Sequence, residues 1–324
     1  MPYIQIVTGF LGSGKTTCVR HLVEAPGDIK IGCVVGEYAE DGFDGRMIQA
    51  SGAMVRQITS TGRGDQAKSY LPAVRAFVEE NVVSRVIVET SGVTEIAQVS
   101  QELWADPIVR AGATFGPTIV VIDAGAFAAH DQHFAHQFWS QIDIADFVAI
   151  NKTDKVPGES LEVIRQRIRA RNPEAKVQFA YMGQIHRASA MSLPYEGFVP
   201  RALRAKWTGV LPAEFESFVY RSERVCHDRI MFGHKLLNLP GPRIARFKGV
   251  LRSWDKSHCV NGLPGQLDWD NTPVDGDTRI AFIGLGLTER EAEIRKVLDD
   301  ELERQKQEVL AETAAQRARR EGRR

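Results

Sequence analysis

The sequence predicts an α/β fold: a doubly wound, mostly parallel sheet of the P-loop NTPase kind, followed by a smaller α+β domain. Apolar, β-branched runs alternate with amphipathic segments through about the first 180 residues. A glycine-rich loop ending in Lys-Thr separates the first run from the first amphipathic segment. After residue 214 the apolar runs begin to alternate with polar residues, as in half-exposed strands.

The strands of the first domain contain almost no polar residues, which is typical of strands buried on both faces of a parallel sheet. The expected strands are Tyr3–Thr8, Lys30–Val35, Arg85–Glu89, Thr118–Asp123, Phe147–Asn151 and Lys176–Ala180. The expected helices between them are Lys15–Glu24, Gln66–Glu80, Thr94–Leu103, Phe127–Gln141 and Ser160–Ala170.

The predicted boundaries follow changes in composition. Residues 1–185 form the first domain, and 186–214 form a linker rich in proline and glycine. Residues 215–300 form the second domain, and 301–324 form a charged helical tail. The elements expected in the second domain are strands Glu216–Ser222, Ile244–Leu251 and Thr278–Leu285 and a helix over Asp228–Leu237, capped by Asp228.

The composition narrows the class of protein. The 324 residues include 41 basic and 41 acidic side chains, so the formal charge is zero and does not favour nucleic acid or a membrane as a partner. No apolar run approaches the roughly 18 residues of a membrane span, and no signal peptide is expected. Four scattered cysteines favour a reducing, cytoplasmic location over a disulfide framework.

The segment Gly9–Thr16 matches the P-loop pattern GxxxxGK[ST]. Glycines let the backbone curl so that its N–H groups converge on phosphate oxygens. The Lys15 ammonium is expected to neutralise the β- and γ-phosphates, and the Thr16 hydroxyl to ligate Mg²⁺. The residues expected to hold the phosphates are Gly12, Ser13, Gly14, Lys15, Thr16 and Thr17.

A carboxylate follows the buried strand Arg85–Val88. Glu89 stands where a Walker-B group holds Mg²⁺ or its water, which makes it a catalytic candidate with Lys15 and Thr16. Gly92, three residues later, is expected to bring a backbone N–H to the γ-phosphate.

The segment Asn151–Asp154 reads Asn-Lys-Thr-Asp and follows another buried strand. The Asp154 carboxylate is able to accept two hydrogen bonds from the guanine edge, whereas adenine would leave it unpaired. Asn151 is expected to support the base, and the Lys152 stem to lie along it. These residues predict GTP as the nucleotide.

With these segments in place, the chain resembles a CobW-type GTPase, a family related to the GTPases that mature urease and hydrogenase. The segments that carry the resemblance are Gly9–Thr17 (GFLGSGKTT), Gly36–Asp44, Glu89–Gly92, Val120–Ala124, Ala145-Asp146 before Asn151, Arg246–Gly249 and Thr278–Gly284. The resemblance implies a GTP-hydrolysing metallochaperone or metal-insertion factor that serves a client metalloprotein, with zinc or cobalt among the metals.

One segment departs from the family pattern. The family carries a CxCC motif where this chain reads Thr59–Gln66, a stretch without cysteine. Thiolates are what make such a site suitable for zinc or cobalt. The replacement candidates, as transition-metal ligands or switch residues, are Glu37, Asp41, His130 and His133. The other interpretation of the histidines is an exposed polar helix face.

Three functions therefore stay open: a GTPase metallochaperone, a GTP-driven assembly switch that binds no transition metal, and a P-loop small-molecule kinase. The guanine-reading segment Asn151–Asp154 counts against the kinase. No arginine finger is evident, so hydrolysis is expected to be slow and stimulated by a partner or by homodimer formation. The segment Glu37–Asp44 is expected to order around the γ-phosphate as a switch.

Overall fold

The structure is a computed structural model that describes residues 1–24, 29–37, 48–49, 51–59, 66–191, 198–204, 215–239, 244–274 and 276–321. The chain divides into two compact units, Met1–Pro212 and Ala213–Arg324. The division falls near the end of the segment predicted as a linker, which contains two short helices, α9 (Arg187–Ala190) and α10 (Arg201–Arg204).

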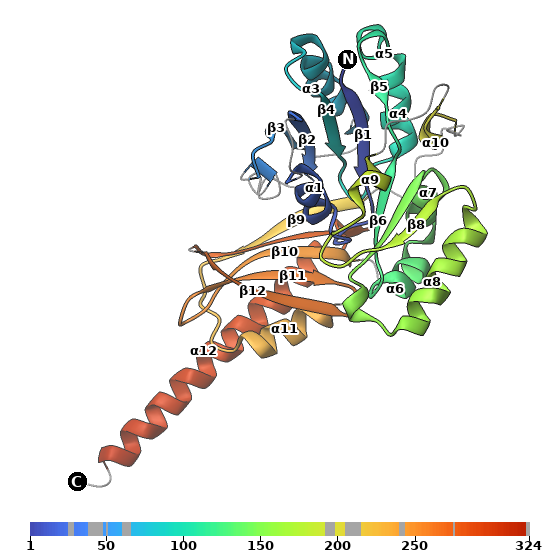
Figure 1. Ribbon diagram of the computed structural model, residues 1–324. Helices are drawn as coiled ribbons and strands as arrows, with labels where there is room; N and C mark the ends of the chain where they lie inside the picture. The colour runs from blue at the N-terminus through green and yellow to red at the C-terminus, as the bar shows by residue number, and fades with distance from the viewer. Residues whose placement is uncertain are drawn as a thin grey trace. The chain divides into compact units, whose positions relative to one another are not determined.

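The first unit is built on an eight-stranded sheet with the order β3-β2-β4-β1-β6-β7-β8, and β5 also pairs with β1 (Figure 1). Every pairing between its described strands is parallel, as predicted. Its strands are β1 (Tyr3–Thr8), β2 (Ile31–Glu37), β3 (Met54–Thr59), β4 (Arg85–Glu89), β5 (Thr114–Phe115), β6 (Ile119–Asp123), β7 (Phe147–Asn151) and β8 (Lys176–Phe179).

Helices cover both faces of this sheet. On β4, Val86 and Val88 pack into the cluster with α3 and α4, whereas Ile87 between them packs with α1. This alternation explains the unbroken apolar strands, because each strand contributes side chains to two cores. The helices are α1 (Lys15–Val23), α3 (Gln66–Glu80), α4 (Ile96–Ala105), α5 (Pro107–Gly112), α6 (Phe127–His133), α7 (Ala135–Asp143) and α8 (Gly158–Arg171).

Two features of this unit differ from the prediction. The single helix predicted over Phe127–Gln141 is wrong, because Phe134 leaves the helical conformation with φ −135° and separates α6 from α7. The Phe134 ring is buried, 5.2 Å from the ring of Phe10 in the P-loop. Strand β3 was not predicted: it is an edge strand with several partly exposed side chains, so its apolar pattern is weak.

The second unit is a five-stranded antiparallel sheet with the order β12-β11-β10-β13-β9. Its elements are β9 (Phe215–Ser222), α11 (Arg229–Leu237), β10 (Ile244–Arg252), β11 (Ser257–Leu263), β12 (Gln266–Val274), β13 (Thr278–Leu285) and α12 (Glu291–Glu321). The predicted cap is confirmed, since the Asp228 carboxylate accepts from the amides of Ile230 and Met231. Strands β11 and β12 were not predicted.

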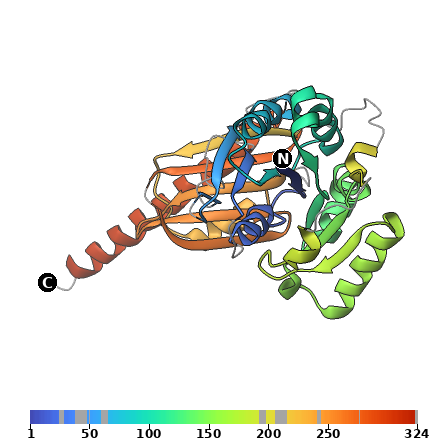
Figure 2. The same ribbon diagram turned by 45° about the horizontal axis from the view of Figure 1, so that its top comes forward.

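Helix α12 begins against the sheet of the second unit and then continues past it (Figures 1 and 2). Ile294, Leu298 and Leu302 follow one another at intervals of four residues and are fully buried in the core of that unit. The helix passes residue 301 without a break, and Gln305 is still buried. The residues beyond Gln305 whose side chains are described are exposed.

Candidate nucleotide-binding site

The glycine-rich loop Gly9–Thr16 leaves the carboxyl end of β1, which lies between β4 and β6. The chain builds β2 to β4 on one side of β1 and then β6 to β8 on the other. Strand β1 therefore marks the point where the strand order reverses, and ligands of doubly wound sheets bind at the carboxyl ends of strands at that point.

The backbone of this loop has the form that an anion cradle requires. Gly9, Gly12 and Gly14 have φ of 147°, 75° and 96°, values that favour glycine. Gly14 caps α1, so the N-terminus of this helix lies at the loop. The Lys15 ammonium donates to the carbonyl oxygens of Gly9 (2.9 Å) and Phe10 (3.2 Å), which curls the lysine side chain over its own loop.

The loop is packed so closely that side chains on its glycines would collide with neighbouring strands. A Cβ on Gly9 would lie 2.0 Å from the carbonyl oxygen of Val121 in β6. A Cβ on Gly14 would lie 2.3 Å from Nδ2 of Asn151, at the end of β7. A Cβ on Gly92 would lie 2.6 Å from the amide nitrogen of Leu11, so the Gly92 turn also touches the loop.

The structure brings Thr16 and Glu89 together, as the sequence predicts. The Thr16 hydroxyl donates to Oε1 of Glu89 over 2.6 Å, although 73 residues separate them in sequence. Glu89 is buried at the end of β4, where its carboxylate is shielded from solvent. A hydroxyl and a carboxylate are hard oxygen ligands of the kind that Mg²⁺ prefers, so this pair fits the predicted magnesium site.

Asn151 links the phosphate loop to the loop that follows β8. Its Nδ2 donates to the carbonyl oxygen of Ser13 over 2.9 Å, and its Oδ1 accepts from the amide of Gly183 over 2.9 Å. The side chain is 2% exposed, so both bonds are shielded from water. Asn151 is thus an organiser of the site rather than a surface group.

Lys152 and Asp154 lie on the turn after Asn151. Lys152 has φ 59°, and its ammonium pairs with Oδ2 of the fully buried Asp123 over 2.7 Å. Oδ1 of Asp123 accepts from the amide of Gly125, which fixes the carboxylate. Asp154 is exposed on a short 3₁₀ turn, Thr153–Lys155, where its carboxylate faces solvent. This geometry holds the lysine stem rigid beside an accessible acceptor.

Three residues of the site were not predicted as site residues. Asp123 pairs with Lys152, Gly183 donates to Asn151, and the Tyr70 hydroxyl accepts from the amide of Ser91 over 3.1 Å. The signal for Asp123 was present, because an acid ends a buried strand there as Glu89 does. Tyr70 and Gly183 lie in segments whose composition gives no such signal.

The two candidate histidines, His130 and His133, have different surroundings. His130 is fully buried, with its ring 4.6 Å from that of Phe10 and 5.6 Å from that of Phe138. Burial, as the main cause, lowers the pKa of His130 to about 4, so the ring is neutral near pH 7. His133 is partly exposed at the end of α6. Within the described part of the chain, no three His, Cys, Asp or Glu side chains gather around one point.

The other metal candidates are Glu37 and Asp41. The backbone of Glu37 ends β2, while its side chain and all of Asp41 lie outside the described residues. The cysteine-free segment Thr59–Gln66 lies mostly outside them as well. Burial raises the pKa of Cys18 and Cys33 to about 12, so these two thiols stay protonated and act as packing groups.

Comparison with known proteins identifies the family of the nucleotide-binding unit. Residues 3–179 match the family model described as "CobW/HypB/UreG, nucleotide-binding domain". Among the described helices, none is both long and apolar enough to cross a lipid bilayer.

Individual relatives are distant. The chain is 29% identical over 216 residues to "Zinc chaperone CobW" of Pseudomonas aeruginosa, a match covering 56% of this chain and 57% of that protein. It is 23% identical over 320 residues to "Zinc chaperone YjiA" of Escherichia coli, covering 90% and 96%. The chain spans little more than half the length of the first of these relatives. The crystal structure of Zn(II)-bound YjiA GTPase from E. coli aligns with 20% identity and a TM-score of 0.42, covering 92% and 98%.

Proposed function

The chain belongs to the CobW/HypB/UreG family, and we propose that it binds and hydrolyses GTP and acts as a metallochaperone or metal-insertion factor for a client metalloprotein. The observation that carries the nucleotide part is Asn151, which joins the P-loop at Ser13 to the segment predicted to read guanine. The zinc-chaperone names of the relatives support the metal part.

The roles of the phosphate-binding residues follow from their positions. The Lys15 ammonium exchanges its bonds to the loop carbonyls for phosphate oxygens, while the loop amides and the α1 N-terminus complete the cradle. Thr16 and Glu89 hold Mg²⁺ directly or through water. When bound, Mg²⁺ supplies charge neutralisation at the β- and γ-phosphates. Gly92 lets its turn approach the loop closely enough to offer a backbone N–H.

Selection of guanine is assigned to Asp154, the exposed acceptor beyond Lys152. Its two oxygens accept from the N1–H and the exocyclic amino group of guanine. The ion pair between Lys152 and Asp123 holds the lysine stem in place, where it packs along the base. Hydrolysis is slow by itself and is stimulated by a partner protein or by a second copy of the chain.

The metal, Zn²⁺ or Co²⁺, is cargo. Its proposed ligands include Glu37 and Asp41 of the switch segment, which begins at the last residue of β2. A second function deserves a test, because the segment Thr59–Gln66 lacks the thiolates that favour such metals. This second function is that of a GTP-driven assembly switch that binds no transition metal. A small-molecule kinase is disfavoured, because it needs no guanine reader.

Isothermal titration with GTP·Mg²⁺ and with Zn²⁺ or Co²⁺, singly and together, separates these functions. The expected result is GTP binding, with one metal bound per chain at an affinity that depends on the nucleotide. GTP binding with only weak, nucleotide-independent metal binding would leave the assembly switch. Failure to bind GTP, or transfer of phosphate to a metabolite rather than to water, would overturn the proposal.

A further inference from the structure

The second unit contains a preformed cavity at one end of its sheet, framed by two turns that are bonded to each other. The amide of Cys226 donates to the carbonyl oxygen of Arg252 over 2.9 Å. In return, the amide of Trp254 (3.2 Å) and the hydroxyl of Ser253 (2.9 Å) both donate to the carbonyl oxygen of Cys226. The segment before α11 and the turn between β10 and β11 therefore form one rigid wall.

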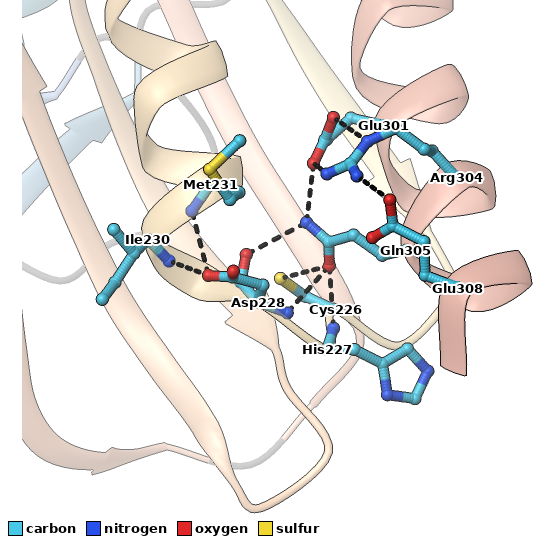
Figure 3. A network of polar contacts seen from close by, with 9 residues as sticks. All are labelled: Cys226, His227, Asp228, Ile230, Met231, Glu301, Arg304, Gln305 and Glu308. Atoms are coloured by element: carbon cyan, nitrogen blue, oxygen red, sulfur yellow. Dashed lines mark hydrogen bonds and ion pairs between the residues drawn. The ribbon is translucent and has the colours of Figure 1, made fainter. Parts of the chain in front are cut away.

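Gln305, a buried residue of helix α12, connects this wall to the helix by hydrogen bonds (Figure 3). Oε1 of Gln305 accepts from the amides of His227 and Asp228, each over 2.9 Å. Its Nε2 donates to the carbonyl oxygen of Asp228 (3.0 Å) and to Oε1 of Glu301 (2.9 Å). Gln305 is 2% exposed, so these bonds are protected from water. The three sides of the cavity are thus fixed relative to one another before any ligand arrives.

The cavity has a volume of about 470 Å³, and its lining combines apolar and basic side chains. The apolar lining includes Leu302, Val225 and Trp254, a tryptophan that is 70% exposed. A second hollow of about 440 Å³ shares Arg252 and Ser253 with the first. The lining of this second hollow also includes Asp255 and Asp277, so only the first hollow has a lining whose charge suits an acidic ligand.

The charged groups of the larger cavity are all basic. Arg224, Arg252 and Lys306 line it, and none of its described lining residues is acidic. Arg224 also pairs with Asp299 (3.3 Å) and Arg252 with Asp277 (2.7 Å), which positions both guanidinium groups. These ion pairs are half-exposed and weak, and a guanidinium has five N–H donors, so donors remain for a ligand carboxylate.

We propose that the first cavity binds an acidic segment of a partner protein, with its carboxylates on Arg224, Arg252 and Lys306 and an apolar side chain against Trp254. That this partner is the client metalloprotein rests on the proposed function. The chain's own C-terminal sequence, residues 316–324, is strongly basic and is unsuited to this site by charge.

Fluorescence anisotropy tests the proposal, with the full-length chain and a labelled synthetic peptide that alternates aspartate with leucine and phenylalanine. The same peptide with asparagine in place of aspartate is the control probe. We expect saturable binding of the acidic peptide at one per chain and at least about tenfold weaker binding of the neutral one. Equal affinity for both peptides, or no saturable binding, would overturn the proposal.

Matched charge reversals on one helix locate the site. Lys306→Glu should weaken peptide binding at least about tenfold. Lys296→Glu, at another exposed lysine of α12 that lies outside the lining, should change it less than about twofold. Trp254→Ala should also weaken binding, by removing the apolar contact. Equal effects of the two reversals would show general attraction to the basic surface and would refute a specific cavity.

GTP binding is measured on the same samples, so that the two proposals fail separately. Loss of peptide binding in Lys306→Glu with GTP binding retained is the expected pattern. Wild-type chain that binds GTP and metal but not the peptide would refute the cavity proposal alone. Wild-type chain that binds the peptide in the cavity but neither GTP nor metal would refute the proposed function and leave the cavity assignment standing.

Discussion

Asn151 Nδ2 donates a 2.9 Å hydrogen bond to the carbonyl oxygen of Ser13, so a residue of the predicted guanine-reading segment holds the phosphate loop directly. The other end of the same amide accepts from Gly183. One buried side chain thereby sets the spacing between the phosphate loop and the loop that follows β8.

Replacing Asn151 with alanine should therefore damage binding more than stability. Leaving the Ser13 carbonyl and the Gly183 amide without this partner should cost about 1–3 kcal/mol of unfolding free energy. The affinity for GTP should fall at least about tenfold, because the loops lose their fixed spacing. Titration calorimetry gives the affinity, and urea unfolding gives the stability.

Asn172→Ala is the matched control. Asn172 is equally buried, and its side chain donates to the carbonyl oxygens of Ile142 and Ala145, away from the P-loop. Its loss should lower stability to a similar degree with little change in GTP affinity. If both variants bind GTP like the wild type, Asn151 is a structural residue only.

Gly14→Ala should abolish GTP binding, whereas Gly52→Ala should not. The two glycines have similar φ, 96° and 91°, so alanine meets a similar backbone penalty of about 1 kcal/mol at each. They differ in space: a Cβ at Gly14 would lie 2.3 Å from Nδ2 of Asn151, while none of the described atoms lies within 4 Å of a Cβ at Gly52. Nucleotide titration and thermal melting of both variants distinguish the steric collision at Gly14 from the backbone strain that alanine meets at both positions. Equal binding by the two would contradict the close packing.

Asp154→Asn should change the preferred base. The asparagine side chain offers an N–H₂ group where the carboxylate accepted, so guanine loses a hydrogen bond and xanthine, with an oxygen in place of the amino group, gains one. GTP should bind at least about a hundredfold more weakly, and XTP more tightly than to the wild type. Competition with a fluorescent nucleotide measures both affinities. Glu159→Gln, an exposed acid at the start of α8, is the control and should leave both unchanged.

The stability of the wild type should fall between about pH 6.5 and pH 4, in part because of His130. Burial lowers the folded-state pKa of His130 from 6.5 to about 4, so the unfolded chain binds more protons throughout that interval. Unfolding free energy therefore falls as the pH falls, by roughly 1.5 kcal/mol from pH 6.5 to 5 for this group. Urea unfolding at about pH 7 and about pH 5 measures the slope.

His130→Phe should flatten that slope, because phenylalanine fits the aromatic surroundings of Phe10 and Phe138 and does not titrate. His133→Phe, on the same helix but partly exposed, should keep the wild-type slope. The difference between variants removes the contribution of carboxyl groups that titrate in the same interval. A slope unchanged by His130→Phe would show that the ring is hydrated in the folded state.

The parts that sequence predicted well are those set by local pattern. Strands buried on two faces must be apolar throughout, so β1, β4 and β7 were predicted with their observed bounds. The P-loop and Asn151 could be recognised because their chemistry requires particular residues at fixed spacing. The pairing of Thr16 with Glu89 followed from the rule that parallel strands bring their carboxyl ends to one edge.

The parts that were missed depend on tertiary contacts. The break at Phe134 has no glycine or proline to mark it; it exists because that ring packs beside Phe10. The burial of His130 was also missed: one interpretation placed this histidine on an exposed helix face, whereas its ring lies buried against the rings of Phe10 and Phe138. Strands β11 and β12 contain the polar and glycine residues of a half-exposed hairpin, which weakens their apolar pattern.

The segment after β8 shows how far the folding unit of the first domain must extend. A Cβ on Gly183 would lie 2.7 Å from the amide of Cys18 in α1, and two carbonyls further on accept from strand residues: Ala190 from Gln5 and Met191 from Arg85. The matched family domain ends at residue 179, before all three contacts. A chain cut at that point would lose the contacts that this segment makes with α1, β1 and β4. It would melt at a lower temperature and less cooperatively than a chain extended past residue 191.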